Sequence, residues 1–237
     1  MFRPAITMGS QPPKFNPALL IVDFQEDFCP PNGSLAVKGG RDIAPVLNRL
    51  LDLPFTLKIA TKDWHPKNHV SFASNHPHPN NKPFESFFTI TNPLNPAESA
   101  ATRLWPDHCV QRTPGAELAP ELDQTKLDEI IEKGQDERVE MYSVFADLFV
   151  NPTVYRSGIS KMLKEKEITH VYVAGLAMDY CVKYSALHAA KEGFGTVVIA
   201  DATKAVDPHL WDQVKAEMEQ AGVIEVGGRG SVPRGWL

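Results

Sequence analysis

The feature that most constrains the fold is the alternation of short apolar, β-branched runs with stretches of helical periodicity. The first run, residues 18–22, reads Ala-Leu-Leu-Ile-Val and has no polar position. Because such a strand must be covered on both faces, it predicts a central strand of a parallel sheet. Further strands are expected at 56–60, 129–132, 170–174, 196–200 and 223–226, and helices at 43–51, 157–166, 179–192 and 208–221. The sequence thus predicts an α/β fold of a single domain, with about six parallel strands and helices on both faces of the sheet.

Composition and net charge indicate which kinds of ligand the protein can bind. The chain has 237 residues, of which 43% are hydrophobic and 22% charged, so it can bury a large core. The net charge of −5 and the lack of a long run of like charges disfavour nucleic acid and membrane surfaces. We therefore expect a small-molecule ligand, and the sequence is compatible with a homo-oligomer. Three cysteines in a chain of this length do not make a disulfide framework, which leaves room for a reactive thiol.

The two ends of the chain lack recognisable targeting signals. Residues 1–16 are rich in proline and polar residues, lack the apolar core of a signal peptide, and are predicted as a flexible tail before a domain at 17–237. No apolar run approaches the roughly 20 residues that span a bilayer. The last three residues, Gly-Trp-Leu, are not a peroxisomal signal. The predicted location is therefore the cytoplasm.

Polar residues follow the predicted strands at the points where the strands end. Asp23 comes after the first strand, Asp63 after the second, Lys133 after the third and Gly175 after the fourth. In open parallel sheets, ligands bind beyond the carboxyl ends of the strands. The Pro- and His-rich segment 66–120 is also too long for an unstructured loop unless it builds a site. One site at this edge of the sheet is therefore expected.

Cys181 is the candidate nucleophile. It lies in residues 175–182, Gly-Leu-Ala-Met-Asp-Tyr-Cys-Val, which predict a strand, a glycine turn and the first turn of a helix. Free N–H groups and partial positive charge at a helix N-terminus stabilise a thiolate, and the same N–H groups can form an oxyanion hole. The alternative is a buried structural cysteine. Asp23 and Lys133, which would otherwise be a turn aspartate and a surface lysine, supply a base and a cation for such a thiol.

A second group of residues has the chemistry of metal ligands. Asp63 and His65 are two positions apart, so in an extended segment both side chains point to the same side. His108 is a third candidate, and the mixed oxygen and nitrogen set suits zinc, iron or manganese. The alternative is a set of loop histidines that hold no ion. His69 lies in the same loop and is a less certain ligand.

At this point a family resemblance becomes specific. Five segments, residues 21–28, 63–66, 105–110, 132–134 and 175–182, occur in the order found in nicotinamidases of the isochorismatase-like hydrolase superfamily. The resemblance extends from about residue 17 to residue 227, and the long loop and residues 175–182 are most similar to fungal members. Met178 departs from the pattern, because much of the superfamily has Thr there.

The resemblance implies a set of roles. Cys181, Asp23 and Lys133 would form a catalytic triad, and a cis peptide between Leu176 and Ala177 would aim the N–H groups of Ala177 and Cys181 at the oxyanion. Asp63, His65 and His108 would bind one divalent transition metal, with zinc favoured over iron or manganese, and His69 resembles an additional ligand of some bacterial members. The residues expected to bind substrate are Phe28, Trp105, Leu176, Tyr142 and Phe145.

The implied activity is the hydrolysis of nicotinamide to nicotinic acid and ammonia through a cysteine thioester, in NAD salvage, with pyrazinamide as a second substrate. The metal would orient the pyridine ring. One alternative is another amidase of the superfamily, acting on a maleamate, ureidoacrylate or carbamoyl compound; those members mostly lack the metal ligands. Another is a non-catalytic metal-binding protein, which would not need the triad. A thiol redox protein is disfavoured because Cys181 has no Cys-x-x-Cys partner.

Overall fold

β1 lies in the interior of a six-stranded parallel sheet whose order is β5-β2-β1-β6-β7-β8. The computed structural model describes residues 14–227. The strands of this sheet are β1 (Pro17–Val22), β2 (Leu57–Asp63), β5 (Glu129–Lys133), β6 (His170–Leu176), β7 (Gly195–Lys204) and β8 (Ile224–Val226). The central position of β1 and the six predicted strands are confirmed, because an apolar run sheltered on both faces is the natural middle of such a sheet.

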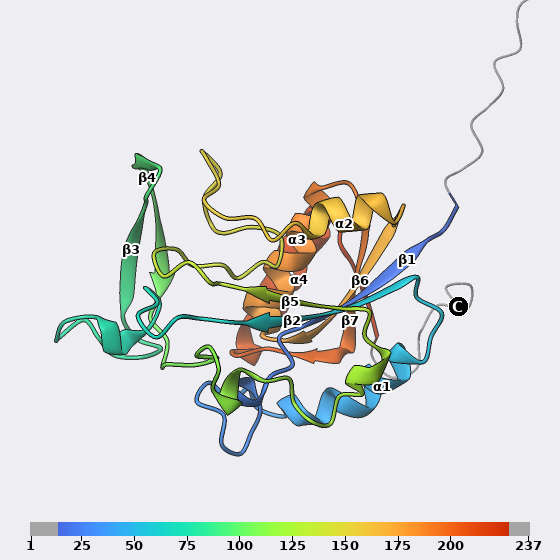
Figure 1. Cartoon of the computed structure of the whole chain (residues 1–237), viewed down its shortest axis with the longest axis horizontal. Coiled ribbons are helices and arrows are strands. Elements are labelled where there is room, and N and C mark those ends of the chain that lie inside the picture. The colour runs from blue at the N-terminus through green and yellow to red at the C-terminus, as the bar shows by residue number, and fades with distance from the viewer. Residues whose placement is uncertain (1–13, 228–237) are drawn as a thin grey trace, which may run out of the picture.

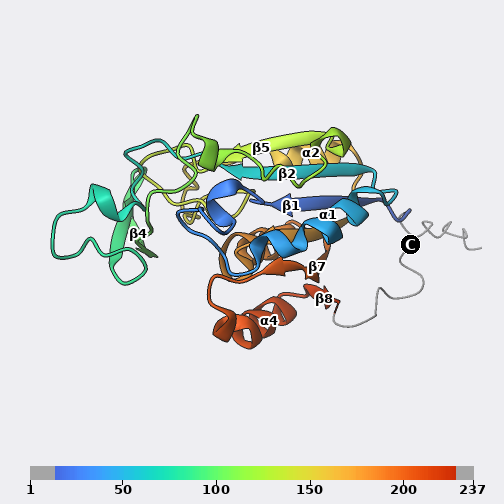
Figure 2. The same cartoon turned by 90° about the horizontal axis from the view of Figure 1, so that it is seen from below.

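Helices cover both faces of the sheet, as predicted (Figures 1 and 2). The helices are α1 (Ala44–Leu51), α2 (Ile159–Glu165), α3 (Lys183–Lys191) and α4 (Trp211–Gln220). α1 packs on one face and buries Ala44, Leu47 and Leu51, which lie on one side of the helix. α3 packs against β6 and β7 on the other face and also contacts α4. The result is a three-layer α/β domain.

A β-hairpin interrupts the long segment between β2 and β5. β3 (Phe87–Asn92) and β4 (Asn95–Arg103) form an antiparallel pair that projects away from the main sheet (Figure 1). The sequence analysis did not predict these strands, because Pro and His residues dominate the surrounding segment. The hairpin is tied to the segment that follows β5, since the Thr102 hydroxyl lies 2.9 Å from the Tyr142 hydroxyl.

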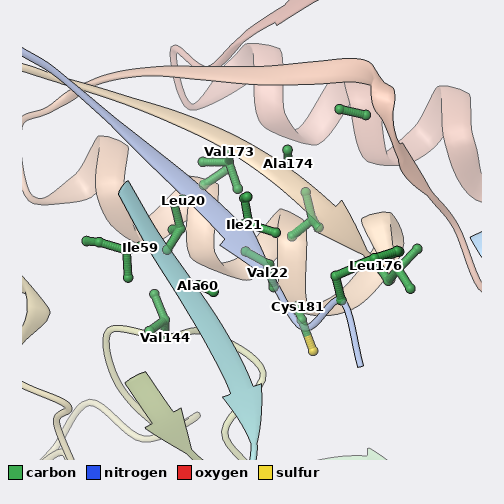
Figure 3. Packing of buried hydrophobic residues seen from close by; sticks show 14 of the residues in the cluster. Leu20, Ile21, Val22, Ile59, Ala60, Val144, Val173, Ala174, Leu176 and Cys181 are labelled. Carbon is green, nitrogen blue, oxygen red and sulfur yellow. The ribbon is translucent and has the colours of Figure 1, made fainter. Parts of the chain in front are cut away.

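Apolar side chains from the central strands pack beneath the carboxyl edge of the sheet. Figure 3 shows Leu20, Ile21 and Val173 in this core, with Cys181 beside the ends of the strands. The core therefore adjoins the predicted site and holds in place the strand ends that form it.

The predicted boundary between the tail and the domain, at residues 16 and 17, stays a prediction. Most of the predicted tail, residues 1–13, lies outside the described residues, as do residues 228–237. The Asn16 side chain, just before β1, donates hydrogen bonds to the carbonyls of Lys166 and Glu167. Within residues 14–227, no helix is long and apolar enough to cross a membrane.

Candidate active site and metal site

The carboxyl ends of four strands meet where the sequence predicted a site. Asp23 follows β1, Asp63 ends β2, Lys133 ends β5, and Cys181 follows β6 after a short turn. All four side chains are buried. One carboxylate oxygen from each aspartate and the Cys181 sulfur lie within 4.8 Å of one another. Burial of this many ionisable groups is costly unless they pair, so their clustering is a strong sign of function.

The turn that carries Cys181 is a single π-helical turn, Met178–Val182, which continues into α3. Ala177 precedes it in a left-handed conformation, with φ 60° and ψ 62°. The Asp179 carboxylate accepts hydrogen bonds of 2.8 Å from the N–H groups of Val206 and Asp207. π-helical turns occur frequently at functional sites. Here the turn places the sulfur beyond the ends of β1 and β6 (Figure 3).

The predicted cis peptide between Leu176 and Ala177 is wrong. All cis peptide bonds among the described residues precede prolines, at Pro31, Pro79 and Pro152. The change in chain direction after β6 is made instead by the left-handed backbone of Ala177. A residue with positive φ redirects the chain while its peptide bonds stay trans.

Lys133 joins the groups of the site. Its ammonium lies 3.0 Å from Asp23 Oδ2 and contacts Asp63 Oδ1 directly. It also lies 3.6 Å from Cys181 Sγ and donates a 3.2 Å hydrogen bond to the Met141 carbonyl. Burial would lower the pKa of Lys133, but the two carboxylates raise it well above its ordinary value. The lysine is therefore charged and neutralises part of the negative charge around the thiol.

Burial controls the protonation of the thiol and of its neighbouring carboxylate. It raises the pKa of Cys181 well above the ordinary value; the Lys133 charge acts in the opposite direction, and Asp23 adds to the rise. Burial also raises the pKa of Asp23, although Lys133 lowers it. The resting sulfur is therefore a thiol, and a carboxylate stands close enough to accept its proton.

Asp63, His65 and His108 form the second group, as predicted. The Asp63 Oδ2 atom lies 3.5 Å from His65 Nε2 and 3.9 Å from His108 Nε2. The Nδ1 atom of His65 is bonded to the Gly134 carbonyl and that of His108 to the Pro106 carbonyl, both at 2.8 Å. Since a carbonyl only accepts, each Nδ1 must carry the proton, and each Nε2 can offer a lone pair.

The charges of this group also suit a metal. Burial and the neighbouring His65 lower the pKa of His108 to about 4, so this ring is neutral near pH 7. Burial would raise the pKa of Asp63, but Lys133 and the two imidazoles lower it well below its ordinary value. An ionised carboxylate and imidazole lone pairs, all within 4.8 Å, fit a divalent transition metal.

A glycine makes room for one of the imidazoles. Gly134 has a φ of 69°, and a Cβ atom there would lie 2.5 Å from His65 Cε1. A side chain at this position would therefore displace the His65 ring. Gly134 follows Lys133 directly, so the same short segment serves both groups.

The structure places His69 beside the metal group but not in it. Its ring packs against the His65 ring, tilted by 32°, with centroids 4.1 Å apart. Its nitrogens are bonded to the Ser71 hydroxyl at 2.8 Å and to the Val139 carbonyl at 3.1 Å. The predicted additional ligand is thus engaged on both nitrogens, and its contact with His65 supports that ring from behind.

A cavity of about 310 Å³ opens onto both groups. Of the predicted substrate-binding residues, Phe28, Trp105 and Tyr142 line it. The Trp105 indole N–H donates a 3.2 Å hydrogen bond to the Tyr142 hydroxyl, which fixes the two rings relative to each other. Ala177 and Cys181 line the same cavity, as an oxyanion hole requires. The aromatic walls of this cavity suit a small aromatic ligand.

Two predicted substrate-binding residues lie elsewhere. Leu176, the last residue of β6, packs toward Gly40 in the core, because neighbouring positions along a strand face opposite sides. Phe145 lines a different cavity, together with His188 and Asp147. Its aromatic character suggested a role that its position does not support.

Sequence analysis missed four further lining residues. These are Leu35, Glu140, Tyr180 and Val206. Tyr180 meets Trp105 edge to face at 4.8 Å, and its place next to Cys181 was a usable signal. Glu140 is buried, and burial raises the pKa of its carboxyl, while the nearby His65 lowers it. Glu140 does not follow a strand, so the local sequence gave no signal that it lies at the site.

Comparison with known proteins agrees with this geometry. Residues 17–227 match the model of the isochorismatase domain. The chain belongs to the isochorismatase family. A nicotinamidase of Acinetobacter baylyi is 40% identical over 219 residues, which cover 90% of this chain and 94% of that protein.

Solved structures in the isochorismatase family are also similar. The structure of the yeast nicotinamidase bound to the inhibitor nicotinaldehyde has a TM-score of 0.83 and 33% sequence identity. The match covers 90% of this chain and 100% of the yeast chain. The pyrazinamidase of Pyrococcus horikoshii in complex with zinc has a TM-score of 0.68 at 32% identity, covering 90% and 99%. The similarity therefore extends to both bacterial and fungal proteins, and beyond them to Pyrococcus.

Proposed function

We propose that this protein is a nicotinamidase, which hydrolyses nicotinamide to nicotinic acid and ammonia in NAD salvage. The observation that carries the proposal is the contact of Lys133 with Asp63. Through this contact, the pair formed by Cys181 and Asp23 is joined to the metal ligands, and both groups adjoin one small cavity with aromatic walls. Nicotinamidases similar over most of the chain support the same activity. The proposed substrates include pyrazinamide, since relatives act on it.

The first half of the reaction forms a thioester. Asp23 accepts the thiol proton of Cys181, and the sulfur attacks the carboxamide carbon of the substrate. Lys133 stays protonated and stabilises the thiolate, from which its Nζ lies 3.6 Å. The carbonyl oxygen gains negative charge, and the N–H groups of Ala177 and Cys181 would stabilise it, each donor contributing about 3 kcal/mol.

The second half releases the acid. Asp23 returns its proton to the departing nitrogen, so that ammonia leaves as the C–N bond breaks. Asp23 then removes a proton from a water molecule, which attacks the thioester carbonyl and frees the Cys181 thiol. The same carboxylate acts in both directions, so it must remain close to the sulfur throughout, as its position within 4.8 Å allows.

Asp63, His65 and His108 would hold one divalent transition metal, which we propose to be zinc, with iron or manganese as alternatives. The pyrazinamidase with bound zinc supports this choice. When bound, the metal supplies a Lewis-acidic site for the pyridine nitrogen. Phe28 and Trp105 line the cavity and would hold the ring of the substrate between them. Cytoplasmic location and a homo-oligomer stay predictions.

The test is an ammonia-release assay on nicotinamide, pyrazinamide, maleamate and ureidoacrylate. We expect turnover of the two aromatic amides and little of the two aliphatic ones. Faster release from maleamate or ureidoacrylate would instead favour the alternative amidase activity.

A further inference from the structure

We propose that Thr61 is a positioning residue that decides which oxygen of Asp23 accepts the Cys181 proton. The inference rests on the proposed amidase function and deepens it. Thr61 lies in β2 and is fully buried. The register pairs Ile21 of β1 with Ala60, so Thr61 stands where β1 leaves the sheet.

The Thr61 hydroxyl makes two contacts with the same residue. Its oxygen accepts a 3.1 Å hydrogen bond from the Asp23 backbone N–H. It also donates a 2.6 Å hydrogen bond to Asp23 Oδ1. A backbone N–H can only donate, so it must face a lone pair of the hydroxyl. The one hydroxyl proton is then left for the carboxylate, and its direction is fixed.

Asp23 Oδ2 has the opposite surroundings. Within residues 14–227, no group donates a hydrogen bond to this atom, although Lys133 Nζ lies 3.0 Å away as an ion pair. The hydrogen bonds of the ammonium go to Asp63, to the Met141 carbonyl and to Cys181 Sγ. Oδ1 is thus engaged by a hydroxyl and Oδ2 is not, so we assign Oδ2 as the oxygen that accepts the thiol proton.

The need for such a clamp follows from the side chain. The terminal torsion of aspartate is broad and roughly two-fold, so the plane of its carboxylate turns easily unless a contact holds it. The backbone of Asp23 has a φ of 48°, which is uncommon for a residue other than glycine. Without the hydroxyl, Oδ1 would be buried without a partner and would compete for Lys133. The oxygen facing the sulfur would then no longer be defined.

The experiment compares Thr61→Val, which keeps shape but removes the hydroxyl, with Thr61→Ser, which keeps the hydroxyl. Thr196→Val is the matched control: Thr196 is also buried in this sheet, at the start of β7, and its hydroxyl donates to the Phe194 carbonyl. For each protein, kcat and KM with nicotinamide, the bound metal and the unfolding temperature are measured. Because Thr61 is two residues from Asp63, the metal content must be known.

We expect Thr61→Val to lower kcat about tenfold or more with KM within about twofold, because the base is misplaced rather than the substrate site. Metal content should be unchanged, and Thr61→Ser and Thr196→Val should stay near wild type. The proposal is overturned if Thr61→Val keeps its kcat, if KM or metal content changes instead, or if Thr61→Ser falls equally. An inactive wild type would contradict the amidase function itself, a result distinct from all of these.

Discussion

The two halves of the site are both buried at one edge of the sheet, yet they are organised differently. On the thiol side, the Lys133 ammonium contacts both the Asp23 carboxylate and the Cys181 sulfur. On the metal side, His65 and His108 are held from behind by backbone carbonyls and present their free nitrogens forward. The first arrangement suits proton transfer, because the groups that exchange a proton lie close together. The second arrangement suits the rigid positioning of a metal ion.

The halves meet at one ion pair, between Lys133 and Asp63. Each Asp63 oxygen serves one half: Oδ1 contacts the lysine, and Oδ2 faces the imidazoles. The comparison therefore predicts unequal effects. Damage to the thiol side should remove the chemistry, whereas damage to the metal side should leave the chemistry but misplace the substrate.

The largest expected effect is that of Cys181→Ala. It should reduce kcat with nicotinamide at least about a thousandfold, because no other group can form the thioester. Metal content should be unchanged, since the sulfur is not part of the histidine group. Cys29→Ala is the control: this thiol is also buried, its pKa is raised to about 12 mainly by burial, and it does not line the cavity. A Cys181→Ala protein with a tenth of wild-type kcat would exclude covalent catalysis by this residue.

The next effect is that of Asp23→Asn, which keeps the shape of the side chain but removes the base. We expect kcat to fall about a hundredfold to ten-thousandfold, the range typical of a lost general base. Bound metal, measured by mass spectrometry of the native protein, should be retained. If the metal were lost together with activity, the two halves would not be separable, and the comparison would fail.

A smaller effect is expected for His108→Ala. It should lose most of the bound metal, of which the wild type should hold about one ion per chain, and kcat/KM should fall up to about a hundredfold through misplacement of the ring. His78→Ala is the control, because His78 is exposed and lies in the same loop. Full metal content in His108→Ala would remove this residue from the site.

How far the sequence predicted this molecule depends on which residues are compared. β1 and the residues at strand ends were predictable, because parallel strands bring their carboxyl ends to one edge. Glu140 and Thr61 were not. Glu140 reaches the cavity from an irregular segment, and Thr61 acts through a hydroxyl contact that strand periodicity does not reveal.

The errors have similar causes. Phe145 and Leu176 were expected in the substrate cavity from the family resemblance, but their side chains point elsewhere. The hairpin of β3 and β4 was missed because its strands lie in a segment rich in turn residues. Local sequence thus predicted which strand ends meet, while the packing of loops over them required the structure.

The most direct test of the division between the two halves compares nicotinamide with benzamide, which has the same shape but no ring nitrogen. The ratio of their kcat/KM values is measured in metal-loaded wild type and in His108→Ala. We predict that the wild type favours nicotinamide by at least about tenfold and that the ratio shrinks toward unity in the variant, because the variant no longer binds the ring nitrogen by which the two amides differ. Equal rates on the two amides in the wild type, or the same preference in His108→Ala, would contradict the account.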